Sequence, residues 1–186
     1  MPLPSAVPLR KRIHIRSIVI EGWKRDDDLW DIEARLTDVK DHDYPLASGL
    51  RPKGEPVHDM RVRVTINREF DIVAAVAVSD VVPYPDGCEN IAPDYARMVG
   101  LNLVRGYRKT VGEMFAGVRG CSHLTELLLG LPAAAVQTMA SEMRDTDGHD
   151  PLAKPFQLDR CHALETNSET VRRYYPRWHQ KAGSSS

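Results

Sequence analysis

The chain has 186 residues, 42% of them hydrophobic and 27% charged, and its formal net charge at pH 7 is -1. Such averages exclude a disordered chain, a collagen-like repeat and a bundle of membrane-spanning helices, and the small net charge gives no overall field for nucleic acid or an acidic membrane surface. Three cysteines and no secretory leader predict a cytoplasmic protein without a disulfide framework.

The first third of the chain predicts two strands. Apolar residues recur at short spacing over residues 13–23, with a change of phase near Ser17, which predicts a strand with a bulge. Residues 30–37 alternate between apolar and polar side chains, as expected of a half-buried strand.

A β-hairpin is expected next. Residues 60–66 and 72–78 form two further strand-like segments around a short polar turn. His58 has the same parity as Met60, so its imidazole is predicted to point toward the apolar side at the entrance of the strand, just after Pro56.

Helical spacing begins after a Pro/Gly-rich turn. Residues 92–103 and 110–118 are compatible with helices. A small polar cap and an early acidic residue mark a helix start at residues 121–129, and a longer helix is expected at 132–143, with proline at its first position.

The end of the chain is expected to hold a polar loop at residues 145–155 and a short basic helix at 168–174. Strands followed by helices, without β-α alternation, predict an α+β fold in which an antiparallel sheet of about four strands packs against C-terminal helices. We expect one domain over residues 12–176, flanked by flexible tails at 1–11 and 177–186. No apolar run is long enough to span a membrane.

Cys121 is the most informative single residue for function. A thiol at a helix N-terminus faces unpaired N–H groups and the positive end of the helix dipole, which favour thiolate. His123 can reach the same space, and Glu126 lies one turn further on. The alternative is a buried, inert cysteine beside a solvated histidine.

Other donors of metal-ligand type occur in two separate segments. Cys161 and His162 are adjacent, and His58 is followed by Asp59. Mixed sulfur, nitrogen and oxygen donors are typical of zinc or iron(II) sites. Cys88 is either a further thiol ligand or an ordinary loop cysteine.

Carboxylates near these donors could carry protons. We expect Glu126, Asp59 or Glu33 to act as general acid or base, although the outer face of a sheet normally holds solvated carboxylates such as Glu33. The sequence has no glycine-rich phosphate loop and no Gly-x-Ser-x-Gly motif. Nucleotide hydrolysis and nucleic-acid binding are therefore not expected.

Four ordered segments carry a resemblance to a known family. They are residues 29–33 (Leu-Trp-Asp-Ile-Glu), 54–60 (Gly-Glu-Pro-Val-His-Asp-Met), 120–127 (Gly-Cys-Ser-His-Leu-Thr-Glu-Leu) and 161–163 (Cys-His-Ala). With them, the chain resembles a bacterial family catalogued as a domain of unknown function (number 2889) over about residues 12–176. The resemblance implies membership of a family but no established activity.

A weaker likeness is to the iron-sulfur scaffold fold of the NifU N-terminal and SufE class. This resemblance implies a related α+β fold and a role as carrier of a metal, an iron-sulfur cluster or sulfur. The positions that match the scaffold motifs are Asp59 before the hairpin, Gly120-Cys121 at the helix start and the pair Cys161-His162.

The donor set favours a small metal-dependent enzyme over these alternatives. Mixed donors favour an open catalytic site, which predicts a lyase, hydratase or hydrolase acting on a small carbonyl or aromatic substrate. Such a chain could form a homo-oligomer. A metal or sulfur carrier and a metal-free small-molecule binding module are the other two hypotheses. The predicted ligands for zinc or iron(II) are His58, Cys121 and His162, with Asp59, Cys161 and His123 around them.

Overall fold

The computed structural model describes residues 3–5, 8–143 and 152–180. The chain divides into two compact units, Met1–Ala135 and Val136–Ser186. No finding tests the expected domain organisation of one domain with two flexible tails, which stays a prediction. The polar loop expected between the last two helices lies largely outside the described residues.

The first unit is built on a four-stranded antiparallel sheet. Its strand order is β1-β2-β5-β6, so every neighbouring pair of strands is antiparallel, and the predicted α+β class is confirmed. A separate small hairpin occupies the Pro/Gly-rich segment, where no strand was predicted. The strands are β1 (His14–Lys24), β2 (Trp30–Lys40), β3 (Tyr44–Leu46), β4 (Gly49–Arg51), β5 (Pro56–Ile66) and β6 (Ile72–Val81).

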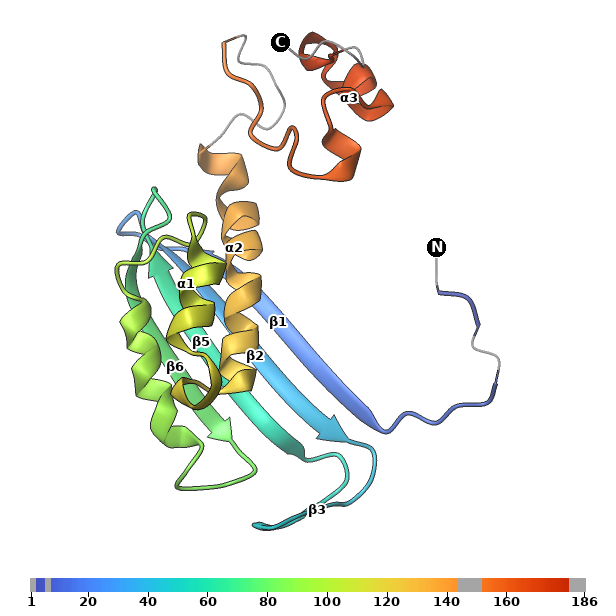
Figure 1. Ribbon diagram of the computed structural model, residues 1–186, viewed down its shortest axis with the longest axis vertical. Coiled ribbons are helices and arrows are strands. Elements are labelled where there is room, and N and C mark those ends of the chain that lie inside the picture. The colour runs from blue at the N-terminus through green and yellow to red at the C-terminus, as the bar shows by residue number, and fades with distance from the viewer. Residues whose placement is uncertain (1–2, 6–7, 144–151, 181–186) are drawn as a thin grey trace. The chain divides into compact units, whose positions relative to one another are not determined.

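Helical segments follow the last strand and cover one face of the sheet (Figure 1). They are the 3-10 helix η1 (Glu89–Met98), the helix α1 (Tyr107–Met114), the short 3-10 turn η2 (Gly117–Arg119) and the long helix α2 (Ser122–Met143), which continues into the second unit.

The core of the first unit lies between the sheet and these helices. Alternation along β2 turns Trp30, Ile32, Ala34 and Leu36 inward, each at most 2% exposed. Helix α2 passes so close to β1 that a Cβ atom on Gly130 would lie 2.5 Å from Ile20 Cδ1. The buried apolar residues of α2 in this unit recur at helical spacing and are Leu124, Leu127, Leu128, Leu131 and Ala135.

The predicted bulge in the first strand is wrong. β1 pairs with β2 without a register shift from His14, opposite Lys40, to Lys24, opposite Trp30. The apolar phase changes for another reason: the inward positions near the start of β1 hold His14 and Arg16 instead of aliphatic residues.

Two of the predicted helix boundaries also differ from the structure. The helix expected at residues 92–103 is the 3-10 helix η1, which begins earlier and contains Pro93, a residue that cannot donate a backbone hydrogen bond. The next helix begins at Tyr107 and ends before Gly117, which has a positive φ of 57°.

Helix α2 runs through Pro132 as one helix, where two helices were predicted. An interior proline costs about 3 kcal/mol in an isolated helix. Leu127, Leu128 and Leu131 before it and Ala135 after it are fully buried, so packing of the apolar face offsets that cost.

The described residues of the second unit hold the end of α2 and three short helical segments. They are η3 (His162–Leu164), α3 (Glu169–Tyr174) and η4 (Pro176–Trp178). The Ser168 hydroxyl accepts a hydrogen bond from the Val171 N–H at 3.2 Å and caps α3, which confirms the short basic helix. Among the described residues, no helix is both long and apolar enough to cross a membrane.

Candidate functional site

A row of polar side chains crosses three strands at one end of the core. Arg16 on β1 lies opposite Asp38 on β2, which in turn lies opposite His58 on β5. The preceding inward row is apolar, with Ile18 opposite Leu36 and Leu36 opposite Met60. The inward face of the sheet therefore changes from aliphatic to ionisable within two residues on each of these strands.

Asp38 is the centre of this row, and its side chain is 4% exposed. Arg16 donates from Nε to Oδ1 at 2.9 Å and from Nη2 to Oδ2 at 2.7 Å, and His14 Nε2 lies 2.8 Å from Oδ1. Burial opposes ionisation, but the hydrogen bonds from Arg16 and His14 outweigh it and hold the pKa of Asp38 well below its usual range. The buried carboxylate is thus charged and partnered on both oxygens.

Two imidazoles approach the same carboxylate oxygen. His58 Nδ1 lies 3.0 Å from Asp38 Oδ2, and His123 Nε2 lies 3.7 Å from it. Their rings stack with centroids 3.8 Å apart and planes at 28°. Burial, and then the charge of His123, lower the pKa of His58 against the opposing effect of Asp38. His58 is therefore biased toward neutral imidazole, the form that binds metals.

The start of α2 is fixed by Tyr95, which positions His123. The Cys121 N–H donates to the Tyr95 hydroxyl at 2.9 Å, and this hydroxyl donates to the Cys121 carbonyl at 3.0 Å. Just before it, a Cβ atom on Gly120 would lie 2.5 Å from the Phe115 carbonyl oxygen, so only glycine fits there. The close approach and the hydroxyl together hold the first turn of the helix over the sheet.

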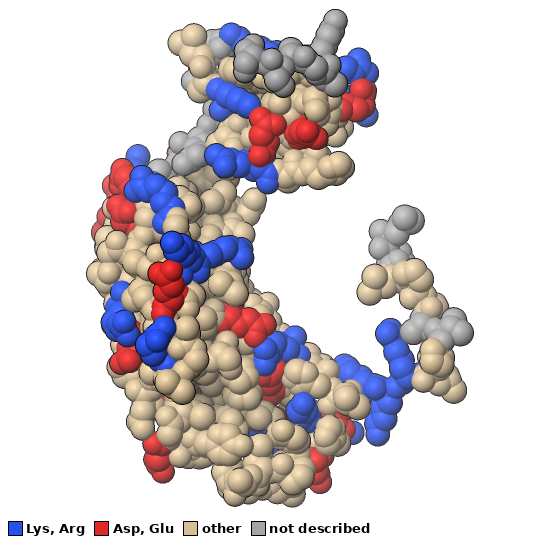
Figure 2. All heavy atoms as spheres, in the orientation of Figure 1, with Lys and Arg blue, Asp and Glu red and all other residues tan. Residues whose placement is uncertain are grey.

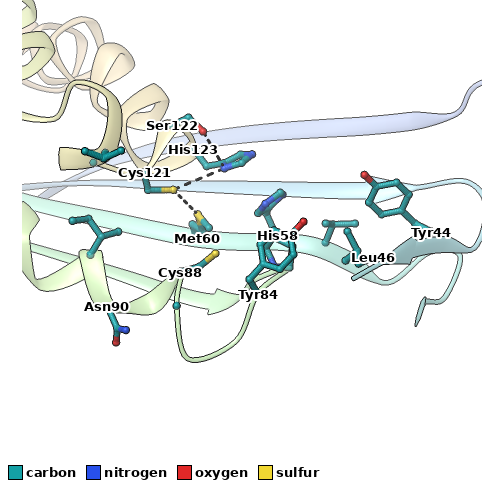
Figure 3. A pocket seen from close by; sticks show the side chains of 16 residues that line it. Tyr44, Leu46, His58, Met60, Tyr84, Cys88, Asn90, Cys121, Ser122 and His123 are labelled. Atoms are coloured by element: carbon teal, nitrogen blue, oxygen red, sulfur yellow. Dashed lines mark hydrogen bonds between the residues drawn. The ribbon is translucent and has the colours of Figure 1, made fainter. Parts of the chain in front are cut away.

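Cys121 lies directly before α2, as predicted, and its thiol lies beside His123. Its Sγ is 3.9 Å from His123 Nδ1 and 4.0 Å from Met60 Sδ (Figure 3). Burial raises the pKa of the thiol, but His123 and the backbone N–H groups of Leu124 and His123 outweigh burial and lower it. The thiol is therefore biased toward thiolate.

A pocket of about 700 Å³ opens beside these residues. His58, His123 and Cys121 line it together with Cys88 and Met60 (Figure 3). This size is within the range of small-molecule sites. The structure thus brings three of the predicted residues, His58, Cys121 and His123, to one concave surface with Cys88, whose role the sequence left open.

Sequence reasoning missed the residues that complete the cluster. Asp38, His58 and His123 each offer a ligand atom, and these atoms all lie within 4.8 Å of one another. Asp38 could have been found, because it occupies the next inward position after Leu36 in an alternating strand. His14 could have been found only together with the strand register.

The three predicted proton carriers lie in different places. Asp59 accepts two hydrogen bonds from Arg35, at 2.9 and 2.6 Å, and Glu33 pairs with Arg63 at 3.4 Å. Both carboxylates have the opposite parity to the inward rows, so they face away from the cluster. Glu126, by contrast, forms an ion pair with Arg16 next to Asp38.

Cys161 and His162 belong to the second unit. Cys161 is exposed and directly precedes η3, of which His162 is the first residue. No finding tests their roles as metal ligands, which stay predictions. Within the first unit, Asp38 forms the cluster together with His58 and His123, two of the ligands expected from the sequence.

Comparison with known proteins places the chain in a family. No curated protein and no solved structure matches it. Residues 14–137 match the family described as Protein of unknown function (DUF2889). This segment includes the polar row, the start of α2 and the pocket, and it ends before Cys161. The chain therefore belongs to the DUF2889 family, as its sequence motifs predicted.

Proposed function

We propose that this chain is a small metal-dependent enzyme in which Asp38, His58 and His123 hold zinc or iron(II). The observation that carries the proposal is the convergence of one carboxylate oxygen and two imidazole nitrogens within 4.8 Å of one another. Two histidines and one carboxylate form a set of protein ligands used for catalytic zinc and for non-haem iron(II).

The distances within the cluster fit such an ion. Two ligands about 2.0 to 2.1 Å from a tetrahedral zinc ion are roughly 3.3 Å apart. The separations of Asp38 Oδ2 from His58 Nδ1 and His123 Nε2 are 3.0 and 3.7 Å, on either side of this value. The ligand nitrogens of the two imidazoles lie within 4.8 Å of each other, and the stacked rings would have to rotate before both nitrogens could face one ion.

The surroundings of Asp38 support a ligand role and also oppose it. His14 and the Arg16 Nε hold Oδ1, as partners of ligating carboxylates commonly do. Arg16 Nη2 contacts Oδ2, the oxygen nearest to both histidines. Binding of a cation therefore requires the guanidinium to move away from Oδ2, and Glu126, its other partner, offers it a place.

The pocket beside the cluster would accommodate the substrate. Three protein ligands leave a coordination position open, and an ion there supplies Lewis acidity, which lowers the pKa of water toward about 7 or polarises a carbonyl oxygen. His58 and His123 line the pocket, so a substrate oxygen bound there would lie beside the cluster. This arrangement supports a lyase, hydratase or hydrolase acting on a small carbonyl or aromatic substrate.

Metal binding can be tested on protein purified without added metal and then exposed to one equivalent of zinc or iron(II). We expect elemental analysis to give about one ion per chain, and we expect at least tenfold weaker zinc affinity in Asp38→Asn and His58→Gln, the range typical of lost ligands or their partners. Asp59→Asn is the matched control, since its carboxylate is also buried and bound to an arginine but faces away from the cluster.

Three results would overturn the proposal: no ion in the unaltered chain, equal losses in Asp38→Asn and Asp59→Asn, or full affinity in both cluster variants. Circular dichroism of each variant separates loss of a ligand from loss of the fold. His162→Ala, measured in the same series, tests the predicted ligand in the second unit independently.

A second candidate function is transfer of sulfur or metal through Cys121. It is favoured by the position of the thiol in the pocket, between the thioether of Met60 and the imidazole of His123. A carrier predicts a persulfide on Cys121, seen by mass spectrometry as one added sulfur atom in protein prepared without reductant. Absence of this species in unaltered protein, or its persistence in Cys121→Ser, would exclude transfer of sulfur through Cys121.

A further inference from the structure

The pocket has a composition unlike that of the surrounding surface. Within the described part of the chain, none of the 16 residues that line it is Asp, Glu, Lys or Arg. These four residue types make up 27% of the chain, and side chains of both signs are spread over the face drawn in Figure 2. The pocket therefore has no permanently charged side chain in its wall.

The nearest carboxylate does not change this conclusion. Asp38 contacts both histidines of the pocket wall but does not line the pocket itself. Its charge is offset by the two-point contact with Arg16. A charged ligand in the pocket would thus meet no Asp, Glu, Lys or Arg side chain in the wall, and burying an unpaired charge is strongly unfavourable.

The lining is instead largely apolar and aromatic, with a few polar side chains. Tyr44 and Tyr84 supply rings, and Val57, Met60 and Ile91 supply aliphatic surface. Polar atoms next to the cluster are found at His58 and His123, which belong to it, and at the Cys121 thiol, which contacts His123 at the start of α2. This is the composition of a site that surrounds a largely apolar ligand and orients it by a few polar contacts.

Val118 adds an independent observation. It lines the pocket and yet is 102% exposed in the turn η2. A fully exposed valine gains nothing from the folded protein by its hydrophobicity, but it can cover the apolar end of a ligand. Its exposure also means that substitutions there can change the pocket without disturbing the core.

We infer that the pocket selects neutral, largely apolar ligands of aromatic size with a single hydroxyl or carbonyl oxygen, and discriminates against carboxylates, phosphates and amines. The claim about ligand binding depends on the pocket alone. The claim that such ligands are the substrates rests on the proposed function. The oxygen would face His58 and His123, and the apolar body would lie against the tyrosines and aliphatic side chains.

Three probes that share a ring and differ in charge test this selectivity: benzyl alcohol, benzoate and benzylammonium. Their binding is measured by titration of amide chemical shifts in the unaltered chain, with a chelator present. We expect benzyl alcohol to shift amides of lining residues and to bind at least tenfold more tightly than either charged probe. Equal or tighter binding of benzoate or benzylammonium, or no shift at lining residues with any probe, would overturn the inference.

Val118→Arg provides a gain-of-binding test. A guanidinium at the pocket wall should improve benzoate binding at least tenfold and weaken benzylammonium binding. The same change at Val104, which is exposed but does not line the pocket, should alter neither affinity. Equal effects at both positions would show that general charge attraction causes the change and would contradict the inference.

The two proposals can fail separately. If the selectivity is present and no metal binds, only the metal-dependent function is excluded. If metal binds with the expected ligands and the probes show no selectivity, only the ligand class is excluded.

Discussion

Asp38 Oδ2 lies 3.0 Å from His58 Nδ1, and these two residues face each other on the neighbouring strands β2 and β5. The contact lies where the inward apolar residues of β2 and of β5 end. Helix α2 brings His123 to the same oxygen from a distant part of the sequence. A single carboxylate thus connects the sheet to the start of the helix. Its removal should affect stability as well as any bound ligand.

Asp38→Asn should destabilise the metal-free protein by about 2 kcal/mol, since hydrogen bonds to a charged group contribute about 1.5 to 3 kcal/mol. Asparagine keeps the volume but removes the buried negative charge that pairs with Arg16, which then has Glu126 as its carboxylate partner. Denaturation by urea at neutral pH measures the change. Asp41→Asn breaks a similar contact with the exposed Arg12 and should have a much smaller effect. Equal losses in the two variants would contradict the role given to burial.

His58 should make the stability of the metal-free protein depend on pH. Its pKa in the folded protein is lowered from 6.5, so the unfolded chain takes up a proton first as the pH falls. The contribution of His58 is therefore fully present above about pH 6.5 and is lost as the pH falls through the folded pKa. Urea titrations from about pH 7.5 to about pH 5.5 should show a steeper loss of stability in the unaltered chain than in His58→Gln. The control, His42→Gln, alters an exposed histidine and should keep the steep slope.

Gly120→Ala should destabilise the protein by about 1 to 3 kcal/mol, the usual cost of overpacking. The added Cβ would lie 2.5 Å from the Phe115 carbonyl oxygen, which can yield only if the start of α2 moves. Gly112 in α1 is the matched control. A Cβ there meets no atom within 4 Å, so Gly112→Ala should stabilise the helix by about 0.5 to 1 kcal/mol. Opposite signs in urea denaturation are the expected result, and equal signs would contradict it.

Alkylation of Cys121 should reach its half-maximal rate below the pH of an ordinary thiol, because the pKa of Cys121 is lowered. His123→Gln should raise the pH of half-maximal alkylation, since His123 is the largest of the groups that favour thiolate there. Mass spectrometry of iodoacetamide-treated protein follows this site separately from the other cysteines. An unchanged profile in His123→Gln would contradict the predicted contact.

Most of the sheet could be predicted from the sequence because alternation is a local signal. The inward rows of β2 and β5 were visible as alternating apolar residues, and His58 was correctly assigned to the inward side. The small hairpin of β3 and β4 was missed because its strands have three residues each, too few for a pattern to develop.

The cluster could be predicted only in part, because strand register and helix placement are not local properties. The change of phase near Ser17 was interpreted as a bulge, although it marks the point where Arg16 enters an inward position. The same change occurs at Asp38, which lies one residue beyond the alternating segment that was predicted as a strand. Only the register between β1, β2 and β5 shows that these changes occur side by side.

The polar row has a consequence for how the sheet assembles. Side chains alternate between faces, so sliding β2 by one residue against its neighbours would place Asp38 on the outer face and oppose Arg16 and His58 with aliphatic or hydroxyl side chains. A slip by two residues would leave a charged carboxylate among the aliphatic residues of the core. The residues that form the candidate site thus also select one alignment of the three strands, so errors of strand pairing are penalised where the ligand would bind.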